Sequence, residues 1–220
     1  MMKSFIKIAT ILVAGIMMTA CSKTPKLDTE TFSYAATVSF AEHLAFIQDG
    51  AGIELDKDMV AKAIEDGLAG KSKMSTVDAE AAVSEFLNIT LPAYVVYTAE
   101  QFMEKASKQR GAVKTNSGLV YKIIKEGDVN NKPNTNSVVT TTYICKNKDG
   151  KTILEVAQPE TVVIRNHVAG VIEGLQQIGK GGEIKLWLPA KLAFGSNGND
   201  EIGILGNEAI SMEIKLLNVE

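Results

Sequence analysis

The sequence is poor in the residues that carry most metal and nucleophilic chemistry. Its 220 residues include only two cysteines, Cys21 and Cys145, and two histidines, His43 and His167. These four residues do not have metal-ligand spacing, and no serine–histidine or cysteine–histidine arrangement stands out. No glycine-rich phosphate loop follows a strand and opens a helix. The sequence therefore predicts neither a metal site nor a cofactor.

An excess of charge of one sign is also missing. The formal net charge is −3 at pH 7, whereas proteins that bind nucleic acid usually carry a basic patch. The sequence therefore predicts no nucleic-acid partner. With 45% hydrophobic residues, the composition is that of an ordinary globular protein. The length suffices for one domain with a core and a smaller appendage.

The apolar run at the N-terminus, Ile8 to Met18, is too short to span a bilayer comfortably. Lys3 and Lys7 place positive charge before and at the edge of this run. A positive segment followed by a short apolar one is typical of an export signal. We therefore predict that residues 1–20 are a signal peptide.

The residues that follow this run predict a lipid anchor. Met18-Thr19-Ala20-Cys21 resembles a bacterial lipobox, which implies that Cys21 becomes lipidated and N-terminal. The expected product is an exported lipoprotein, anchored to a membrane and facing the periplasm or the cell surface. The alternative is an ordinary signal peptide cut near Ala20, which leaves a free thiol. In the lipoprotein interpretation, residues 21–31 are a flexible tether.

The region of residues 32–112 is predicted to be helical. Apolar residues recur at three- to four-residue spacing, and Asp56 and Ser75 are suited to cap the N-termini of the second and third helices. Pro92 lies inside the third helical pattern and should break or kink the helix near Leu91, with helix resuming by residue 99. Such small helices cannot bury their apolar faces alone.

The region of residues 113–220 is rich in predicted strands. One expected strand has alternating residues on a single face, Asp149-Gly150 is a hairpin signal, and residues 170–178 are a short helix. A second alternation follows the glycines after that helix. These patterns predict an α+β fold, with an antiparallel sheet over one short helix. The alternating residues are Val139, Thr141, Tyr143 and Cys145 in the first strand, and Ile184, Leu186 and Leu188 in the second.

Three consecutive features after that helix carry a family resemblance. They are the glycine end of the helix, the strand Gly181-Gly182 to Pro189, and the turn Leu192-Ala193-Phe194-Gly195. In this order they resemble the hallmark of the FKBP family of peptidyl-prolyl isomerases. The resemblance implies an FKBP-like isomerase domain at residues 113–220.

The helical region has a resemblance of its own. Ser33-Tyr34-Ala35, Leu55 to Asp58 and Lys71 to Ser75 resemble the N-terminal dimerisation segment of Mip-like periplasmic FKBPs. This implies that residues 32–112 are a helical dimerisation domain and that the protein is a homodimer. The alternative is a monomeric helical cap.

The FKBP resemblance also implies a site. It places catalytic roles on Tyr143, Phe194 and the backbone N–H of Val168. Phe194 lacks the hydroxyl of the family's tyrosine, Leu154 stands where the family has aspartate, and Val171 where it has tryptophan. We therefore expect weakened catalysis, and the alternative is that these side chains are only core. The implied substrate-binding residues are Ile153, Leu154, His167, Val171 and Met212.

The function implied is prolyl cis–trans isomerisation together with folding assistance to exported proteins. The expected partners are unfolded or proline-containing exported polypeptides. Prolyl rotation needs no metal, nucleophile or acid–base pair, so the lack of such groups agrees with this chemistry. A second hypothesis is a non-catalytic chaperone or binding lipoprotein on the same scaffold, and a remoter one is an adhesin.

Two further residues have interpretations of their own. Trp187 should point away from the face of Leu186 and Leu188. We favour packing of Trp187 against a neighbouring loop or the helical arm over an exposed contact with client polypeptides. Cys145 is predicted to be a buried free thiol.

Overall fold

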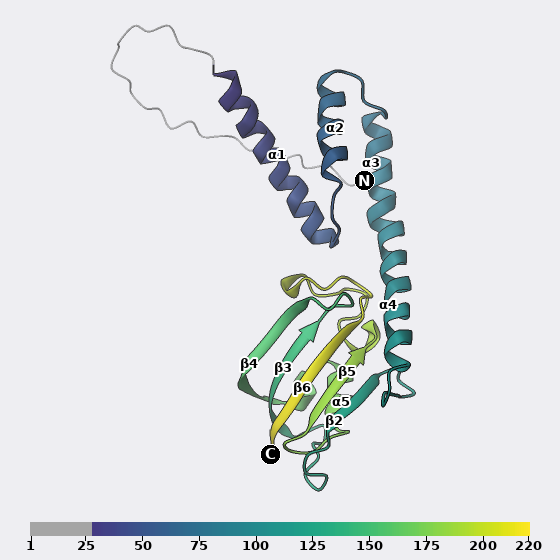
Figure 1. The fold of residues 1–220 in the computed structure, drawn as a ribbon, viewed down its shortest axis with the longest axis vertical. Helices are drawn as coiled ribbons and strands as arrows, with labels where there is room; N and C mark the ends of the chain where they lie inside the picture. Colours follow the sequence, from purple (N-terminus) through teal and green to yellow (C-terminus); the bar gives the residue numbers. More distant parts are fainter. Residues whose placement is uncertain (1–27) are drawn as a thin grey trace, which may run out of the picture. The chain divides into compact units, whose positions relative to one another are not determined.

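The computed structural model describes residues 28–220, apart from the side chains of residues 49–51 (Figure 1). The predicted export signal, the lipobox cysteine Cys21 and most of the tether therefore lie outside the described residues. Glu42–Glu220 form one compact unit. The chain up to Ala41 is a separate unit, and its described part is the first half of helix α1 (Thr29–Ala51).

The N-terminal region is helical, as predicted. After α1 come α2 (Lys57–Leu68) and α3 (Thr76–Glu85). The Asp56 carboxylate accepts a hydrogen bond from the Met59 N–H at 3.0 Å, and the Ser75 hydroxyl accepts one from the Asp78 N–H at 3.1 Å. Each bond satisfies a donor that the first turn of a helix leaves unpaired. Both predicted N-caps are confirmed.

Of the break or kink predicted near Leu91, the break is wrong, and a π-helical turn stands directly before Leu91. The chain stays helical from α3 through the π-helical turn η1 (Phe86–Thr90) into α4 (Leu91–Ser107). The Leu91 N–H bonds to the carbonyl of Phe86, five residues earlier, rather than to the usual partner four residues earlier. Pro92 then occupies one of the first two positions of α4, where a missing N–H costs least. The π turn thus accommodates the proline without ending the helix.

The C-terminal region is an antiparallel sheet of six strands in the order β1-β2-β5-β6-β3-β4 (Figure 1). The predicted α+β fold is confirmed. β5 and β6 lie in the middle of the sheet and β4 is an edge strand. The strands are β1 (Val113–Lys114), β2 (Val120–Lys125), β3 (Val138–Lys146), β4 (Thr152–Val163), β5 (Glu183–Leu188) and β6 (Ile210–Val219).

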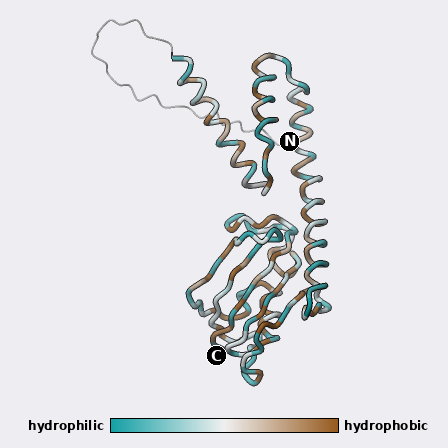
Figure 2. Tube along the Cα trace, in the orientation of Figure 1, coloured by the Kyte–Doolittle hydropathy of each residue, from teal (hydrophilic) through white to brown (hydrophobic). Residues whose placement is uncertain are grey.

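The main core lies between this sheet and the short helix α5 (Ala169–Leu175). Alternation works as predicted, because Ile184, Leu186 and Leu188 of β5 are all buried. Figure 2 shows hydrophobic and polar residues interspersed along the strands. Gly174 brings α5 close to β5, since a Cβ there would lie 2.5 Å from Leu186 Cδ2. Three short 3₁₀ turns complete the unit: η2 (Ile164–Asn166), η3 (Ala190–Leu192) and η4 (Asp200–Ile202).

A second, smaller cluster covers the other face of the sheet at Trp187. This side chain is 3% exposed although it points away from the main core. Lys185 Nζ lies 5.4 Å from the centre of the indole ring. The preferred interpretation, packing against a neighbouring loop or the helical arm, is confirmed, because α4 and Ala112 supply part of the cover. The residues packed around Trp187 are Phe102, Met103, Ala106, Ala112 and Val120.

Candidate functional site

The site begins with β3, whose inward-facing residues are Val139, Thr141, Tyr143 and Cys145, as predicted. Tyr143 lies opposite Ile214 of β6 and Val156 of β4. Opposite residues of an antiparallel pair share a face, so the buried Ile214 fixes the side of Tyr143. Tyr143 is half-buried and packs against the main core on the side that carries α5.

The chain between η2 and α5 brings His167 to Tyr143, and Val168 packs against the same core. The rings of Tyr143 and His167 meet edge to face, with centroids 6.4 Å apart and planes at 85°. Val168 is the N-cap of α5, and its carbonyl accepts hydrogen bonds from the Val171 and Ile172 N–H groups at 3.0 and 3.2 Å. Among the described residues, nothing accepts a hydrogen bond from the Val168 N–H. His167 Nε2 is likewise buried without a partner in this part of the chain.

The remaining predicted site residues line the same side of the sheet. Val171 and Met212 belong to the buried core, at 2% and 7% exposure. Ile153, Leu154 and Phe194 are partly buried and pack against that core. Leu154 lies opposite Cys145, two residues along β3 from Tyr143. The structure thus brings all eight predicted residues to the α5 side of the sheet, where the lining is mainly aliphatic.

Burial is the largest cause of the pKa shifts in the site. Burial raises the pKa of Tyr143, and the charge of Glu160 raises it further. Burial lowers the pKa of His167, with Glu160 acting in the opposite direction. Both groups are therefore neutral at pH 7, and the arrangement offers hydrogen-bonding groups in apolar surroundings rather than an acid–base pair.

Sequence reasoning missed Glu160. Thr141 lies opposite Glu160 in the β3–β4 pair, so the carboxylate stands on the same face as Tyr143. Between Thr141 and Tyr143 there is one residue, whereas β4 has Ala157, Gln158 and Pro159 between Val156 and Glu160. This bulge adds two residues to β4, so Val156 and Glu160 keep the same phase of the alternation and stand on the same face. Residues 157–160 are all exposed and show no apolar alternation of their own, and it is the pairing with β3 that places Glu160 beside Tyr143.

Cys145 is a buried free thiol, as predicted. Burial, with a smaller effect of the Glu208 charge, raises its pKa to about 12. The thiol is therefore protonated at neutral pH, and only the thiolate form is a nucleophile. Within residues 28–220, no three histidine, cysteine or acidic side chains come together as metal ligands would.

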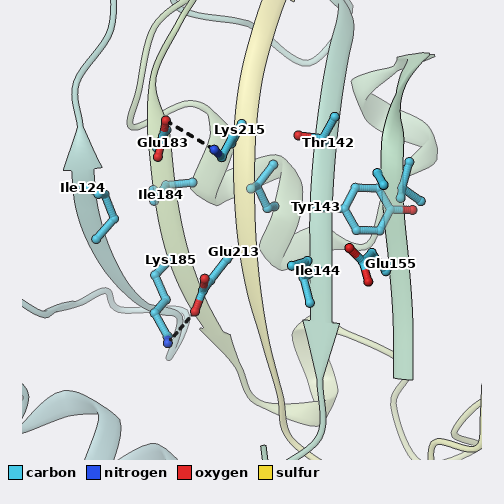
Figure 3. A pocket seen from close by; sticks show the side chains of 13 residues that line it. Ile124, Thr142, Tyr143, Ile144, Glu155, Glu183, Ile184, Lys185, Glu213 and Lys215 are labelled. Carbon is cyan, nitrogen blue, oxygen red and sulfur yellow. Dashed lines mark hydrogen bonds and ion pairs between the residues drawn. The ribbon is translucent and has the colours of Figure 1, made fainter. Parts of the chain in front are cut away.

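The opposite face of the sheet carries a shallow hollow of about 450 Å³ (Figure 3). Two ion pairs cross it: Lys185 Nζ to Glu213 Oε1 at 2.8 Å, and Lys215 Nζ to Glu183 Oε1 at 3.9 Å. By strand alternation Glu155 of β4 also belongs to this face, since it lies opposite Ile144. Of the eight predicted residues only Tyr143 belongs to this lining, so the hollow and the predicted site share that one residue and lie on opposite faces of the sheet.

Two family models match the chain. The domain amino-terminal to FKBP-type peptidyl-prolyl isomerase matches residues 29–123, and the FKBP-type peptidyl-prolyl cis-trans isomerase matches residues 129–217. Several curated relatives are also similar. The FKBP-type peptidyl-prolyl cis-trans isomerase FkpA of Escherichia coli O6:H1 is 30% identical over 211 residues, which cover 89% of this chain and 77% of that protein. FkpA of Aeromonas hydrophila is 25% identical over 260 residues, covering 100% and 96%.

Solved structures agree. The crystal structure of Escherichia coli FkpA matches with a TM-score of 0.59 and 28% identity, over 89% of this chain and 98% of that chain. A peptidyl-prolyl cis-trans isomerase from Pseudomonas syringae matches the fold with a TM-score of 0.54, at 22% identity over 58% of this chain. On the fold, the two family models and these relatives, the chain belongs to the family of FKBP-type peptidyl-prolyl cis-trans isomerases.

Proposed function

We propose that proline-containing peptides are isomerised on the α5 side of the sheet, between Tyr143, Val168 and Phe194. One observation carries this proposal. The Val168 N–H has no acceptor among the described residues, and Val168 directly follows His167, whose ring meets Tyr143 edge to face. An unpaired amide of this kind is available to a substrate carbonyl.

The surroundings suit the chemistry. Prolyl rotation is slow because twisting breaks amide resonance, with a barrier of about 18–20 kcal/mol. The planar amide is more charge-separated than the twisted one, so an apolar surface disfavours the planar ground state more. The aliphatic side chains of Ile153, Leu154 and Met212 provide such a surface. A fixed donor at Val168 adds stabilisation of the twisted state.

We further propose that turnover is slower than in a family member with the complete aromatic lining. Leu154 supplies no carboxylate to orient the Tyr143 hydroxyl, and Phe194 has no hydroxyl of its own. Val171 is smaller than the tryptophan that the resemblance expects, so it excludes water from less of the site. Each change removes either an oriented group or part of the apolar wall.

A tetrapeptide isomerisation assay on residues 22–220 tests the site. Phe194→Tyr adds a hydroxyl at a partly buried loop position, and it should raise kcat/KM about 2–10-fold, the effect of one hydrogen bond. Tyr143→Ala should lower kcat/KM, whereas Tyr97→Ala, on the exposed surface of α4, should leave it unchanged. A kcat/KM insensitive to both Phe194→Tyr and Tyr143→Ala would place the reaction elsewhere.

A second candidate function is a non-catalytic chaperone on the same scaffold. The aliphatic lining favours it, because holding an unfolded chain needs apolar surface rather than oriented donors. Wild type that suppresses aggregation of an unfolded client but isomerises no peptide would support this alternative. Measurable isomerisation that Tyr143→Ala abolishes would exclude it.

The N-terminal sequence supports export and lipid anchoring. We infer that residues 1–20 are removed, that Cys21 is lipidated, and that residues 21–31 tether the protein to a membrane, facing the periplasm or cell surface. Among residues 28–220 no helix has the length and hydrophobicity needed to cross a bilayer. In this proposal the clients are unfolded or proline-containing exported polypeptides.

Fractionation of cells that express the full chain tests the anchor. Cys21→Ala should move the protein from the membrane to the soluble fraction, because no lipid can be attached. Ser22→Ala, at the neighbouring position, should leave it with the membranes. Equal membrane association of wild type and Cys21→Ala would exclude anchoring through Cys21.

We also propose that residues 32–112 form a dimerisation domain and residues 113–220 the isomerase domain. α2 and α3 contain no buried residue, and Met59 and Met74 are 56% and 55% exposed. These side chains border a hollow of about 580 Å³ that α2, α3 and the turn between them share. Exposed apolar surface of this extent supports an interface with a second copy of the chain.

A further inference from the structure

Glu160 stands at the rim of the proposed isomerase site. The ladder of β3 and β4 pairs it with Thr141, which is 1% exposed and points to the α5 side of the sheet. The Glu160 side chain is therefore on that side too, two residues along β3 from Tyr143. Unlike Thr141, Glu160 is exposed, because β4 is the edge strand.

The backbone pairing on both sides fixes the face of the sheet on which Glu160 stands. The next residue, Thr161, shares a hydrogen bond with Thr140 between their hydroxyl oxygens, at 2.9 Å on the other face. Pro159, just before Glu160, belongs to the bulge and fits an edge strand because it needs no acceptor. The bulge before Glu160 and the Thr140–Thr161 hydrogen bond after it therefore hold this part of β4 in one register with β3.

Nothing in the described part of the chain neutralises Glu160. No lysine or arginine nitrogen of residues 28–220 lies within ion-pair distance of its carboxylate. Arg165, the nearest basic residue along the sequence, makes no such pair either. The charge of Glu160 nevertheless acts on Tyr143 and His167. It adds to the raising of the Tyr143 pKa by burial, and it opposes the lowering of the His167 pKa by burial. Its field therefore extends over the site.

We propose that Glu160 is a specificity-determining residue that favours proline segments carrying lysine or arginine next to the proline. The inference rests on the proposed site around Tyr143, Val168 and Phe194, and it adds a preference for charge to an otherwise apolar site. A cationic side chain beside the bound proline pairs with the Glu160 carboxylate. An acidic side chain in that position is repelled.

The expected preference is modest and depends on salt. An exposed ion pair changes an equilibrium by about 2–5-fold, and both charges are partly screened at physiological ionic strength. The preference should shrink at about 0.5 M salt, where the screening length falls to a few ångströms. A preference due to apolar contact would not shrink under these conditions.

Isomerisation and binding of matched peptides by residues 22–220 test the inference. One peptide series carries lysine, alanine or glutamate before the proline, and a second series carries them after it. In at least one series, wild type should prefer lysine over glutamate by about 2–5-fold at low salt. Glu160→Gln should remove this preference and Glu160→Lys should reverse it.

Glu155→Gln is the matched control. It removes the same charge from the same strand, but Glu155 belongs to the opposite face of the sheet, in the hollow of Figure 3. The preference should survive this change. If Glu155→Gln and Glu160→Gln reduce the lysine preference equally, the preference comes from net charge and the role of Glu160 is overturned. A wild type that shows no preference in either peptide series would overturn it too.

Equilibrium binding of the same fluorescent peptides separates this inference from the proposed site. Turnover without any charge preference overturns the role of Glu160 and leaves the site intact. If binding prefers lysine and Glu160→Gln removes that preference, the role of Glu160 is supported even when no peptide is isomerised. The lack of isomerisation then counts against the proposed catalysis. Thermal melting of each variant checks that its fold is retained.

Discussion

Glu208 shows at the scale of a single residue how the fold changes a side chain's chemistry. It is 7% exposed, and its Oε2 accepts a hydrogen bond from the Leu205 N–H at 3.0 Å. Burial raises its pKa, and this outweighs the lowering by that hydrogen bond and by Lys148. The folded state therefore binds this proton more tightly than the unfolded state does.

The sign of the pH effect follows from linkage. A raised pKa gives a stabilising contribution that is complete when the group is protonated, below its ordinary pKa of 4.5. The contribution is lost as pH rises through the pKa of the folded state. Glu208 is therefore a destabilising charge at neutral pH.

Glu208→Gln should raise the melting temperature at pH 7–8. The amide is uncharged and its oxygen still accepts from the Leu205 N–H, so burial costs less. A gain of 1 kcal/mol corresponds to about 2–4 °C in a protein of this size. The difference from wild type should disappear near pH 4, measured by thermal melting at several pH values.

Glu201→Gln, at an exposed position in η4, is the control and should change little at any pH. A Glu208→Gln variant that melts lower than wild type at pH 7–8, or whose effect does not vary with pH, would contradict this account of Glu208.

At the scale of elements, two glycines set the distance between α5 and the sheet. A Cβ on Gly170 would lie 2.5 Å from Leu188 Cδ2, and one on Gly174 would lie 2.5 Å from Leu186 Cδ2. Both leucines are fully buried in β5. Because α5 begins at the Val168 N-cap, any shift of this helix also moves the proposed substrate donor.

Gly174→Ala should destabilise the protein by about 1–3 kcal/mol, the usual cost of overpacking a core. In an exposed helix the same change stabilises by roughly 0.5–1 kcal/mol, because alanine is the better helix former. Gly67 of α2 provides that comparison, since its nearest neighbour, Ser72 Oγ, would lie 3.9 Å from a new Cβ. Urea unfolding should therefore move in opposite directions for Gly174→Ala and Gly67→Ala. Equal shifts for the two variants would show that α5 does not pack as closely as described.

At the scale of the whole molecule, the chain buries its apolar surface unevenly. The sheet and α5 enclose a core of fully buried side chains, whereas α2 and α3 bury none. Large apolar side chains in α1 are also exposed: Phe32 and Tyr34 are 72% and 75% exposed. A second chain would cover such surface at little cost in polar desolvation.

The proposed dimer predicts a difference between two fragments in light scattering. Residues 22–220 should run as a dimer, and residues 91–220 should run as a monomer. The shorter fragment keeps α4, because this helix covers Trp187 and its removal would expose new apolar surface. Trp187 fluorescence checks that the fragment remains folded. If residues 22–220 are monomeric, the proposal that residues 32–112 mediate assembly fails. If both fragments are dimers, helices α1 to α3 are not needed for assembly, and the prediction that they form the interface is wrong.

The sequence by itself determined the features that depend on neighbouring residues. Asp56 and Ser75 cap helices because their side chains reach backbone groups three residues away. The alternation in β3 and β5 identifies the buried face because strand geometry repeats every two residues. The same local patterns identified the short helix, the glycine-rich turn after it and the α+β class.

Only the tertiary structure decided the features that depend on distant partners. α4 covers Trp187, and pairing with β3 places Glu160 beside Tyr143 on the face of the proposed site. Residues 141 and 160 are 19 positions apart, and a two-residue bulge lies just before Glu160 in β4. A local pattern tells which side of an element is apolar. The long-range packing that folds the chain decides what covers that side and which charged group stands beside it.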